Sequence, residues 1–408
     1  MGWYKRIIIE LPPPYWFIWS GTLINQLGMF VAPFFMIYLT QIRHVSVMYA
    51  AASLSVVGIG RLVAAPIGGV MADRWGRRPT IITSLISAAF CTLGLGLVPT
   101  GAILDGLALM WGFTNNVFRP AAQAAIVDLV GEEHRRQAFA LNYWAGNMGV
   151  AIGPMLAGLL MQWHPTAMFF LDGLTTLVFA ILMSRCVLPR VSTQRSDGSL
   201  HSWRHTMDQL LHDRLLIGLA MLAFLFAMVY FQNTSTLPVV MHAQGLTDAD
   251  YGLAIAMNGV TVLIFSLPIN ALIRHMSPGR AMSLAALLLG TGFGLVAFVH
   301  GEGIIMMTVM IWTLGEVIAT PVAAAWIGQI SPPHLRGTYQ GIYAAGWGAA
   351  QILGPLAGGI VLTAWGDTNL WLICFGVGCI VMLGYGTLTM WSRNRLMSES
   401  STSGKPVS

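Results

Sequence analysis

Residues 69–78 of this chain read Gly-Val-Met-Ala-Asp-Arg-Trp-Gly-Arg-Arg. The stretch lies between two long apolar runs and places three arginines and one aspartate beside two glycines. A connection this short has no room for a domain of its own. Cationic side chains at the end of an apolar run are typical of the cytoplasmic face of a membrane protein. The stretch therefore predicts a tight cytoplasmic turn between two membrane-spanning helices.

The composition of the whole chain supports a membrane protein. Of its 408 residues, 56% are hydrophobic and 9% are charged, and the mean hydropathy is +0.69. Soluble domains carry about 25% charged residues. The net charge of +5 indicates basic loops beside anionic lipid and no nucleic-acid partner. The sequence shows no nucleotide-binding loop, metal-ligand cluster or nucleophile triad, so we expect no enzyme, metal or cofactor. The four cysteines are expected to be structural.

Twelve apolar runs are long enough to cross a bilayer, which takes about 20 residues per helix. The first follows Lys5 and Arg6 and is too long for a signal peptide, so it is predicted to be retained. The expected spans are 15–39, 47–71, 80–98, 102–126, 137–161, 167–188, 215–239, 251–273, 280–299, 303–327, 338–363 and 369–391.

The distribution of charge orients these spans. All but three of the 21 Lys and Arg residues fall in the N-terminus, the C-terminal tail or the loops that follow even-numbered spans. The exceptions are Arg43, in a loop after an odd-numbered span, and Arg61 and Arg119, within spans. Positive residues concentrate on the cytoplasmic side, so both termini are expected there, in a multi-pass protein of a bacterial cytoplasmic membrane.

The chain divides into two similar halves. At a constant offset of 201 residues, Trp111 pairs with Trp312, Pro120 with Pro321, and Arg135 with Arg336. Parallel repeats of this kind build transporters with a substrate site near the membrane midplane. We expect a first half at 1–189, a polar cytoplasmic linker at 190–213, a second half at 214–395, and a polar cytoplasmic tail at 396–408.

Residues 69–78 resemble the G-x3-D-R-x-G-R-R loop between the second and third helices of the major facilitator superfamily, at every defined position. The resemblance extends over essentially the full chain and implies an all-α membrane fold of twelve helices in two pseudo-symmetric halves. In the family this loop latches the halves in the outward-facing state. It implies that Asp73 contacts the start of span eleven, near residues 336–341. The gating residues would be Gly69, Asp73, Arg74, Gly76, Arg77 and Arg78.

Span five carries small residues four apart followed by a proline, a pattern that favours close helix packing and a bend. It resembles the G-x8-G-x3-G-P-x2-G-G motif of drug/proton antiporters, although Ala140 and Ala157 replace two of its glycines. Plain helix packing also explains the pattern. With its second-half copy, the motif comprises Gly149, Gly153, Pro154, Gly158, Gly354, Pro355, Gly358 and Gly359. The span-four motif R-x-x-Q-G is largely missing, since Ala108 and Trp111 occupy the Arg and Gln positions.

Ionisable residues inside the bilayer indicate function because they are costly to bury. Glu316, near the middle of span ten, is the first candidate for a proton carrier, and a structural hydrogen bond is its alternative. Asp172 in span six and Arg61 in span two are the other coupling candidates. Arg119 either lines the pocket or extends to the cytoplasmic surface.

Polar and aromatic side chains within the spans supply candidates for a pocket, some of which are expected only to bond across helices. They are Asn25, Gln26, Asn115, Asn116, Arg119, Asn142, Tyr143, Asn147, Tyr230, Asn233, Asn258 and Tyr343. An aromatic cavity with few charges suits small amphipathic or lipophilic molecules. The residues and the resemblance together favour a proton-driven exporter of drug-like molecules. We expect it to be monomeric and surrounded by lipid. The alternatives are a metabolite importer, a flippase for lipid-linked molecules, and a non-transporting receptor, which would need neither Glu316 nor Arg61.

Overall fold

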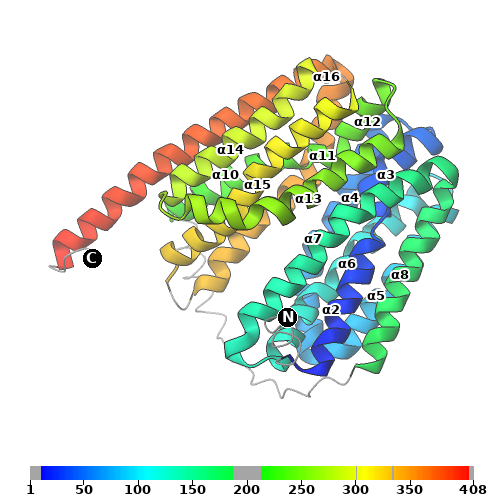
Figure 1. Cartoon of the computed structure of the whole chain (residues 1–408), viewed down its shortest axis with the longest axis horizontal. Helices are drawn as coiled ribbons and strands as arrows, with labels where there is room; N and C mark the ends of the chain where they lie inside the picture. Colours follow the sequence, from blue (N-terminus) through cyan, green and yellow to red (C-terminus); the bar gives the residue numbers. More distant parts are fainter. Residues whose placement is uncertain (1–10, 187–212, 300, 333–334, 404–408) are drawn as a thin grey trace. The chain divides into compact units, whose positions relative to one another are not determined.

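A computed structural model describes residues 11–186, 213–299, 301–332 and 335–403. Within them the chain is almost entirely helical (Figure 1). Ten segments are long and apolar enough to cross a membrane, and one of these, residues 338–389, contains two helices that meet at Gly366. The 28-residue helix Ala102–Leu129 supplies a further crossing. The described residues therefore account for all twelve predicted spans.

The helices of the first half follow the predicted spans and mostly extend beyond their apolar cores. They are α2 (Pro13–Leu27), α3 (Val31–Ile37), the π-helical turn η1 (Tyr38–Ile42), α4 (Val47–Arg74), α5 (Arg77–Leu97), α6 (Ala102–Leu129), α7 (Glu132–Trp163) and α8 (Pro165–Arg185). Span one, expected as one helix, is broken after Leu27. Gly28 ends α2, and Pro33 lacks the backbone N–H that would continue the hydrogen-bonding pattern.

The second half contains a similar break. Its helices are α10 (Arg214–Tyr230), α11 (Gln232–Ser235), α12 (Leu237–Ala243), α13 (Asp248–Ile273), α14 (Pro278–Leu295), the 3-10 turn η2 (Val296–Phe298), α15 (Glu302–Ile330) and α16 (Arg336–Ser403). Span seven is thus divided among α10, α11 and α12. In α16 the backbone of Gly366 is non-helical, with φ at 82°, and this separates spans eleven and twelve. The predicted linker 190–213 lies, apart from Asp213, outside the described residues. The helix also continues into the predicted tail, as far as Ser403.

The structure forms two compact units that do not coincide with the two halves of the sequence. The first unit contains residues 1–195 together with 232–263 and 355–363. In this unit, α5 and α8 run side by side (Figure 1). The side chains of Tyr15 and Trp19 in α2 donate hydrogen bonds to the carbonyl oxygens of Ala138 and Leu141 in α7, at 2.8 and 3.0 Å. These bonds fix the register of α2 on α7.

Close backbone approach joins α4 to α6. A Cβ atom added at Gly60 would overlap the carbonyl oxygen of Leu109, and one added at Gly112 would overlap that of Val57. Gly68 makes the same kind of approach to Val117. Glycine permits this distance because it has no side chain. The contact sets which face of α6 remains available to α2 and α7.

The second unit contains residues 196–231, 264–354 and 364–408. The Phe293 ring stacks between Trp312 and Trp371, with ring centroids 5.5 and 6.1 Å away. Gly290 and Gly378 allow α14 and α16 to approach closely. All three aromatic side chains are buried, and they form the centre of this unit.

Candidate functional site

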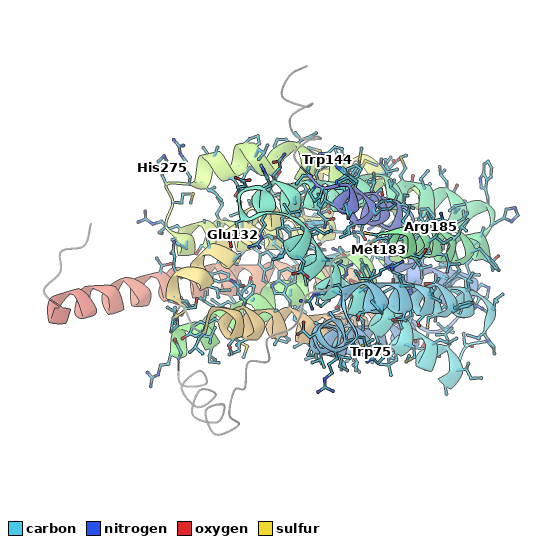
Figure 2. The ribbon with its side chains drawn as sticks, turned by 90° about the horizontal axis from the view of Figure 1, so that it is seen from below. Trp75, Glu132, Trp144, Met183, Arg185 and His275 are labelled. Carbon is cyan, nitrogen blue, oxygen red and sulfur yellow. The ribbon has the colours of Figure 1, made fainter. Side chains whose placement is uncertain are left out.

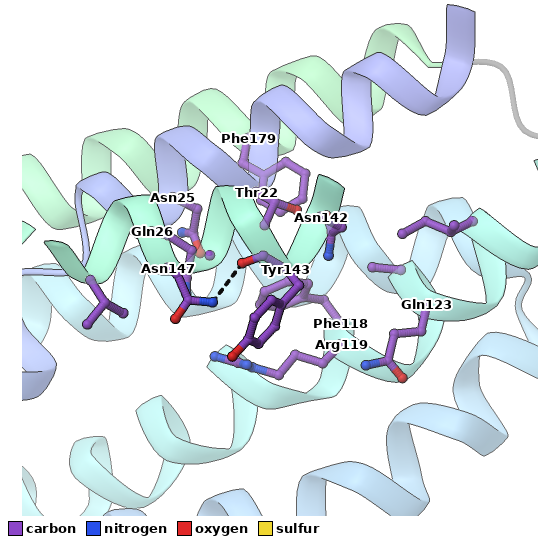
Figure 3. Close-up of a pocket in the computed structure, with 14 residues that line it drawn as sticks. Thr22, Asn25, Gln26, Phe118, Arg119, Gln123, Asn142, Tyr143, Asn147 and Phe179 are labelled. Carbon is purple, nitrogen blue, oxygen red and sulfur yellow. Dashed lines mark hydrogen bonds between the residues drawn. The ribbon is translucent and has the colours of Figure 1, made fainter. Parts of the chain in front are cut away.

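A cavity of about 300 Å³ lies within the first unit, among α2, α6, α7 and α8 (Figure 3). Its walls combine aromatic and aliphatic side chains with amides and one arginine. Phe118 and Phe179 meet edge to face there, with centroids 5.8 Å apart. Arg119 of α6 and Tyr143 of α7 both line this cavity (Figure 3). Its lining residues are Thr22, Asn25, Gln26, Phe118, Arg119, Ala122, Gln123, Ile126, Asn142, Tyr143, Gly146, Asn147, Val150 and Phe179.

A second, smaller cavity of about 30 Å³ adjoins the first. Asn25, Gln26 and Arg119 line both. The remaining residues around the small cavity are Met29, Ala32, Arg61, Trp111, Asn115, Asn116 and Asp172. We call the two together the joined cavities. Two arginines and one carboxylate thus surround the small cavity.

The joined cavities collect most of the residues proposed from the sequence. Eight of the twelve pocket candidates line them, namely Asn25, Gln26, Asn115, Asn116, Arg119, Asn142, Tyr143 and Asn147, together with the coupling candidates Arg61 and Asp172. Arg119 is exposed to the cavity.

The other four pocket candidates, Tyr230, Asn233, Asn258 and Tyr343, do not line either cavity. The buried Asn233 instead offers its backbone oxygen to Tyr251, whose hydroxyl lies 3.1 Å from it and from the carbonyl oxygen of Pro33.

One face of α6 lines the joined cavities with more residues than the sequence predicted. Trp111, Asn115, Arg119 and Gln123 follow one another at intervals of four residues, which places them along one side of a helix. The sequence places Trp111 in the repeat and in the span-four motif, and neither Trp111 nor Gln123 is among the predicted pocket residues. The four-residue spacing from Arg119 is the signal that would have identified both.

Asp172 connects α8 to the break in span one. Its Oδ2 atom accepts hydrogen bonds from the backbone N–H groups of Phe30 and Val31, at 3.1 and 2.9 Å. The interruption between α2 and α3 leaves these groups without a helical acceptor, and the Phe30 N–H also donates to the carbonyl oxygen of Gly28, at 2.8 Å. A carboxylate accepts only, and it satisfies both. Asp172 itself is 4% exposed.

Arg61 extends from α4 toward α6, beside the small cavity. Its guanidinium lies 6.0 Å from the centroid of the Trp111 ring, within the range of a cation–π contact. Its Nε atom and the Trp111 Nε1 atom are both buried and have no hydrogen-bond partner among the described residues. Arg61 and Arg119, both cationic, line the same small cavity. The site thus contains strong donors without acceptors.

Glu316, the first coupling candidate, lies in α15 of the second unit. Its Oε1 atom is 3.4 Å from the Tyr230 hydroxyl. Tyr230 packs edge to face against Trp312 and Trp347, with ring centroids 5.7 and 5.6 Å away. The partly buried carboxyl group of Glu316 therefore lies at the edge of an aromatic cluster, next to the hydroxyl of Tyr230.

The predicted gating residues lie where α4 turns into α5. Gly76 provides the turn with a φ of 95°, and Trp75 is exposed beside it (Figure 2). Arg77 forms ion pairs with Asp73 and, at 3.2 Å, with Asp128 of α6. Arg78 donates hydrogen bonds to the carbonyl oxygens of Met183 and Ser184 at the end of α8. These bonds tie the loop to its own half, and the contact with residues 336–341 stays a prediction.

The glycine-proline motif of α7 packs against two helices of the first unit. A Cβ atom at Gly149 would collide with Gln26 of α2. One at Gly158 would lie 2.6 Å from the Asp248 carbonyl oxygen of α13. In the second copy, Gly358 faces Gln232, and Gly359 lies against Ala51. The motif therefore lets helices approach closely.

Comparison with known proteins identifies the family. The family model of the Major Facilitator Superfamily matches residues 18–247 and 219–406. The chain belongs to this superfamily. It is therefore a membrane transporter and not an enzyme.

Several relatives are similar over most of their length. The MFS-type transporter YqjV of Bacillus subtilis (strain 168) is 26% identical over 96% of both chains. A Na(+), Li(+), K(+)/H(+) antiporter of Planococcus maritimus is 21% identical over 73% of this chain and 77% of its own. Multidrug resistance protein MdtH of Aeromonas hydrophila is 23% identical over 84% and 86%.

Solved structures confirm the fold. The crystal structure of the nucleoside transporter NupG superposes with a TM-score of 0.80 at 12% identity, over 93% of this chain and 99% of its own. A POT family transporter superposes with a TM-score of 0.78 at 14% identity, over 95% and 99%. At this level of identity the likeness shows the fold alone.

Proposed function

We propose that this transporter exports small amphipathic or lipophilic molecules across a bacterial cytoplasmic membrane by proton antiport with alternating access. The observation that carries the proposal is the cavity of about 300 Å³ among α2, α6, α7 and α8. Binding pockets for drug-sized molecules have volumes of about 300–1,000 Å³ and mostly apolar walls with a few polar groups. The Phe118 and Phe179 rings provide such a wall, and Asn142 and Asn147 provide polar groups.

The names of the relatives support export and ion exchange. One relative is a multidrug resistance protein and another exchanges alkali cations for protons. Both are distant, so their activities indicate a class of transport and no particular substrate.

Proton coupling requires a group that binds a proton on one side of the membrane and releases it on the other. Glu316 remains our first candidate because it is a partly buried carboxyl group within a span, 3.4 Å from the Tyr230 hydroxyl, and burial, hydrogen bonds and nearby charges decide whether such a group holds a proton. Asp172 is the second candidate. Its two backbone hydrogen bonds would be altered by any movement of the break in span one.

The test uses purified protein in proteoliposomes with a trapped pH indicator and an imposed pH gradient. Adding amphipathic dyes from a panel should produce a proton flux that depends on the substrate. Glu316→Gln keeps the shape of the side chain and a hydrogen-bond acceptor for Tyr230. We expect it to abolish uphill accumulation while downhill exchange continues. Glu302→Gln, at the start of the same helix, should behave like the wild type.

The direction and the carrier are decided in the same assay. Uphill transport by Glu316→Gln at the normal rate with an unchanged pH profile would show that Glu316 is structural. Accumulation of substrate in the direction of proton flow would show import. Transport that is independent of the pH gradient would rule out proton coupling.

A further inference from the structure

We propose that the joined cavities bind amphipathic organic anions, with Arg61 and Arg119 as the cationic ligands of the anionic group. This inference rests on the proposed transport function and adds the charge of the substrate.

The positive charge of the site is not matched by carboxylates nearby. No ion pair within 4.0 Å joins either arginine to an acid of the described residues. One carboxylate, that of Asp172, lines the small cavity. It already accepts two hydrogen bonds from Phe30 and Val31. The lining therefore keeps an excess of positive charge.

The hydrogen-bonding groups of the site need acceptors. Arg61 Nε and Trp111 Nε1 are buried without a partner among the described residues, and both groups only donate. A buried donor without an acceptor is costly. A carboxylate, sulfonate or phosphate brings acceptor oxygens together with the opposite charge. A neutral or cationic ligand would leave the charge of the two arginines unmatched.

The backbone contact between α4 and α6 brings the two arginines to the same cavity. Gly60 and Gly112 hold α4 and α6 in contact, and this contact places Arg61 beside Trp111. Arg119 lies on the same face of α6 as Trp111, two turns further on. Two cationic side chains thus line one small cavity. An anion between them would offset the repulsion between their like charges.

The sizes of the cavities divide the ligand into two parts. The small cavity, at about 30 Å³, has room for about two water-sized groups, which suits a single ionic group. The larger cavity, at about 300 Å³, accommodates an apolar body against Phe118 and Phe179. Arg119 lines both, so it lies where the charged and apolar parts of a ligand would join.

The test is equilibrium dialysis of the purified full-length protein in nanodiscs, with empty nanodiscs as the blank. The probes share one aromatic body and differ in charge: 1-naphthaleneacetate, 1-naphthaleneacetamide and (1-naphthylmethyl)trimethylammonium. Because charge-assisted hydrogen bonds are about twice as strong as neutral ones, we expect the acetate to bind at least about tenfold more tightly than the acetamide. The ammonium compound should bind most weakly.

Matched substitutions locate the preference. Arg61→Gln and Arg119→Gln should each reduce the preference for acetate to about threefold or less, because each removes one charge-assisted contact. Both should leave acetamide binding intact, which shows that the variants are folded. Arg185→Gln, at the exposed end of α8 (Figure 2), should keep the full preference. If Arg61→Gln also loses acetamide binding, the result for Arg119→Gln decides whether the anion preference depends on these arginines. The Arg119 side chain is exposed to the cavity, so its replacement disturbs the packing less.

Several results would overturn the inference. Equal binding of acetate and acetamide would do so, as would tighter binding of the ammonium compound. An acetate preference that survives both arginine substitutions would place the anion elsewhere. Absence of saturable acetate binding would also reject this class of ligand. Nanodiscs carry no gradient, so acetate binding without proton-driven transport would refute the proposed coupling and leave the anion site standing. Proton-driven export of neutral dyes without acetate binding would refute the anion site and leave the proposed coupling standing.

Discussion

At the scale of single residues, Asp172 shows how one side chain can stabilise an interrupted helix. Its carboxylate satisfies two backbone donors that the break between α2 and α3 leaves without helical partners. The sequence indicated that Asp172 was important because an acid in an apolar span is costly. It did not indicate this partner, because the break in span one lies far from Asp172 in the sequence.

Asp172→Asn should lower the free energy of unfolding by about 1.5–3 kcal/mol, the usual contribution of a hydrogen bond to a charged group. The amide keeps one acceptor but loses the charge. Thermal unfolding of the purified protein measures the effect. Glu133→Gln makes the same chemical change at a side chain that is 82% exposed, and it should leave the unfolding temperature unchanged. Equal stability of Asp172→Asn and wild type would mean that the two backbone bonds contribute nothing measurable.

At the scale of helices, the α4–α6 contact determines where the arginines of the site lie. Its glycines, Gly60, Gly68 and Gly112, fall within apolar spans where the sequence offered many glycines. The sequence does not show which of these glycines lie in close backbone contact, because that depends on which helix packs beside them. The glycines of span five could be singled out because they resemble a family motif.

Gly60→Ala and Gly112→Ala should each destabilise the protein by about 1–3 kcal/mol, since added atoms overpack a close contact. Each should also weaken binding at the joined cavities, because α4 and α6 must separate. Gly106→Ala, also in α6, is the matched control. A Cβ atom at Gly106 meets nothing within 4 Å, and alanine is the better helix former by about 1 kcal/mol. Thermal unfolding of the three variants ranks them, and equal stability of all three would contradict the close contact.

At the scale of the whole molecule, the compact units differ from the halves of the sequence. Residues 232–263 and 355–363 come from the second half, yet they belong to the first unit. The internal repeat predicts two similar sets of six spans, and it says nothing about which segments pack together. Within the first unit, Gly252 and Gly259 of α13 approach the backbone of α7 closely. This packing explains why residues 232–263 belong to the first unit.

The predicted orientation can be tested with single cysteines in a background that lacks the four native ones. A membrane-impermeant thiol reagent should label His44→Cys in intact cells. It should label Leu200→Cys only after the membrane is opened, because the positive residues place that loop in the cytoplasm. Labelling of both positions from the same side would contradict the predicted orientation and the number of spans.

The class of the protein, the number of its spans and the family resemblance could be predicted from the sequence alone. These features depend on local composition and spacing, since a bilayer requires about 20 apolar residues per crossing wherever the helix lies. The sequence also supplied the candidates Arg61, Arg119 and Asp172, because charge within an apolar span stands out.

Which of these residues meet depends on the packing of the helices. It brought Arg61 to Trp111, Asp172 to the break in span one, and eight of the twelve pocket candidates to the joined cavities. It left Tyr230, Asn233, Asn258 and Tyr343 outside them. The direction in which a side chain points depends on how its helix is rotated against its neighbours. In this protein that rotation is set by backbone contacts at glycines, between helices distant in the sequence.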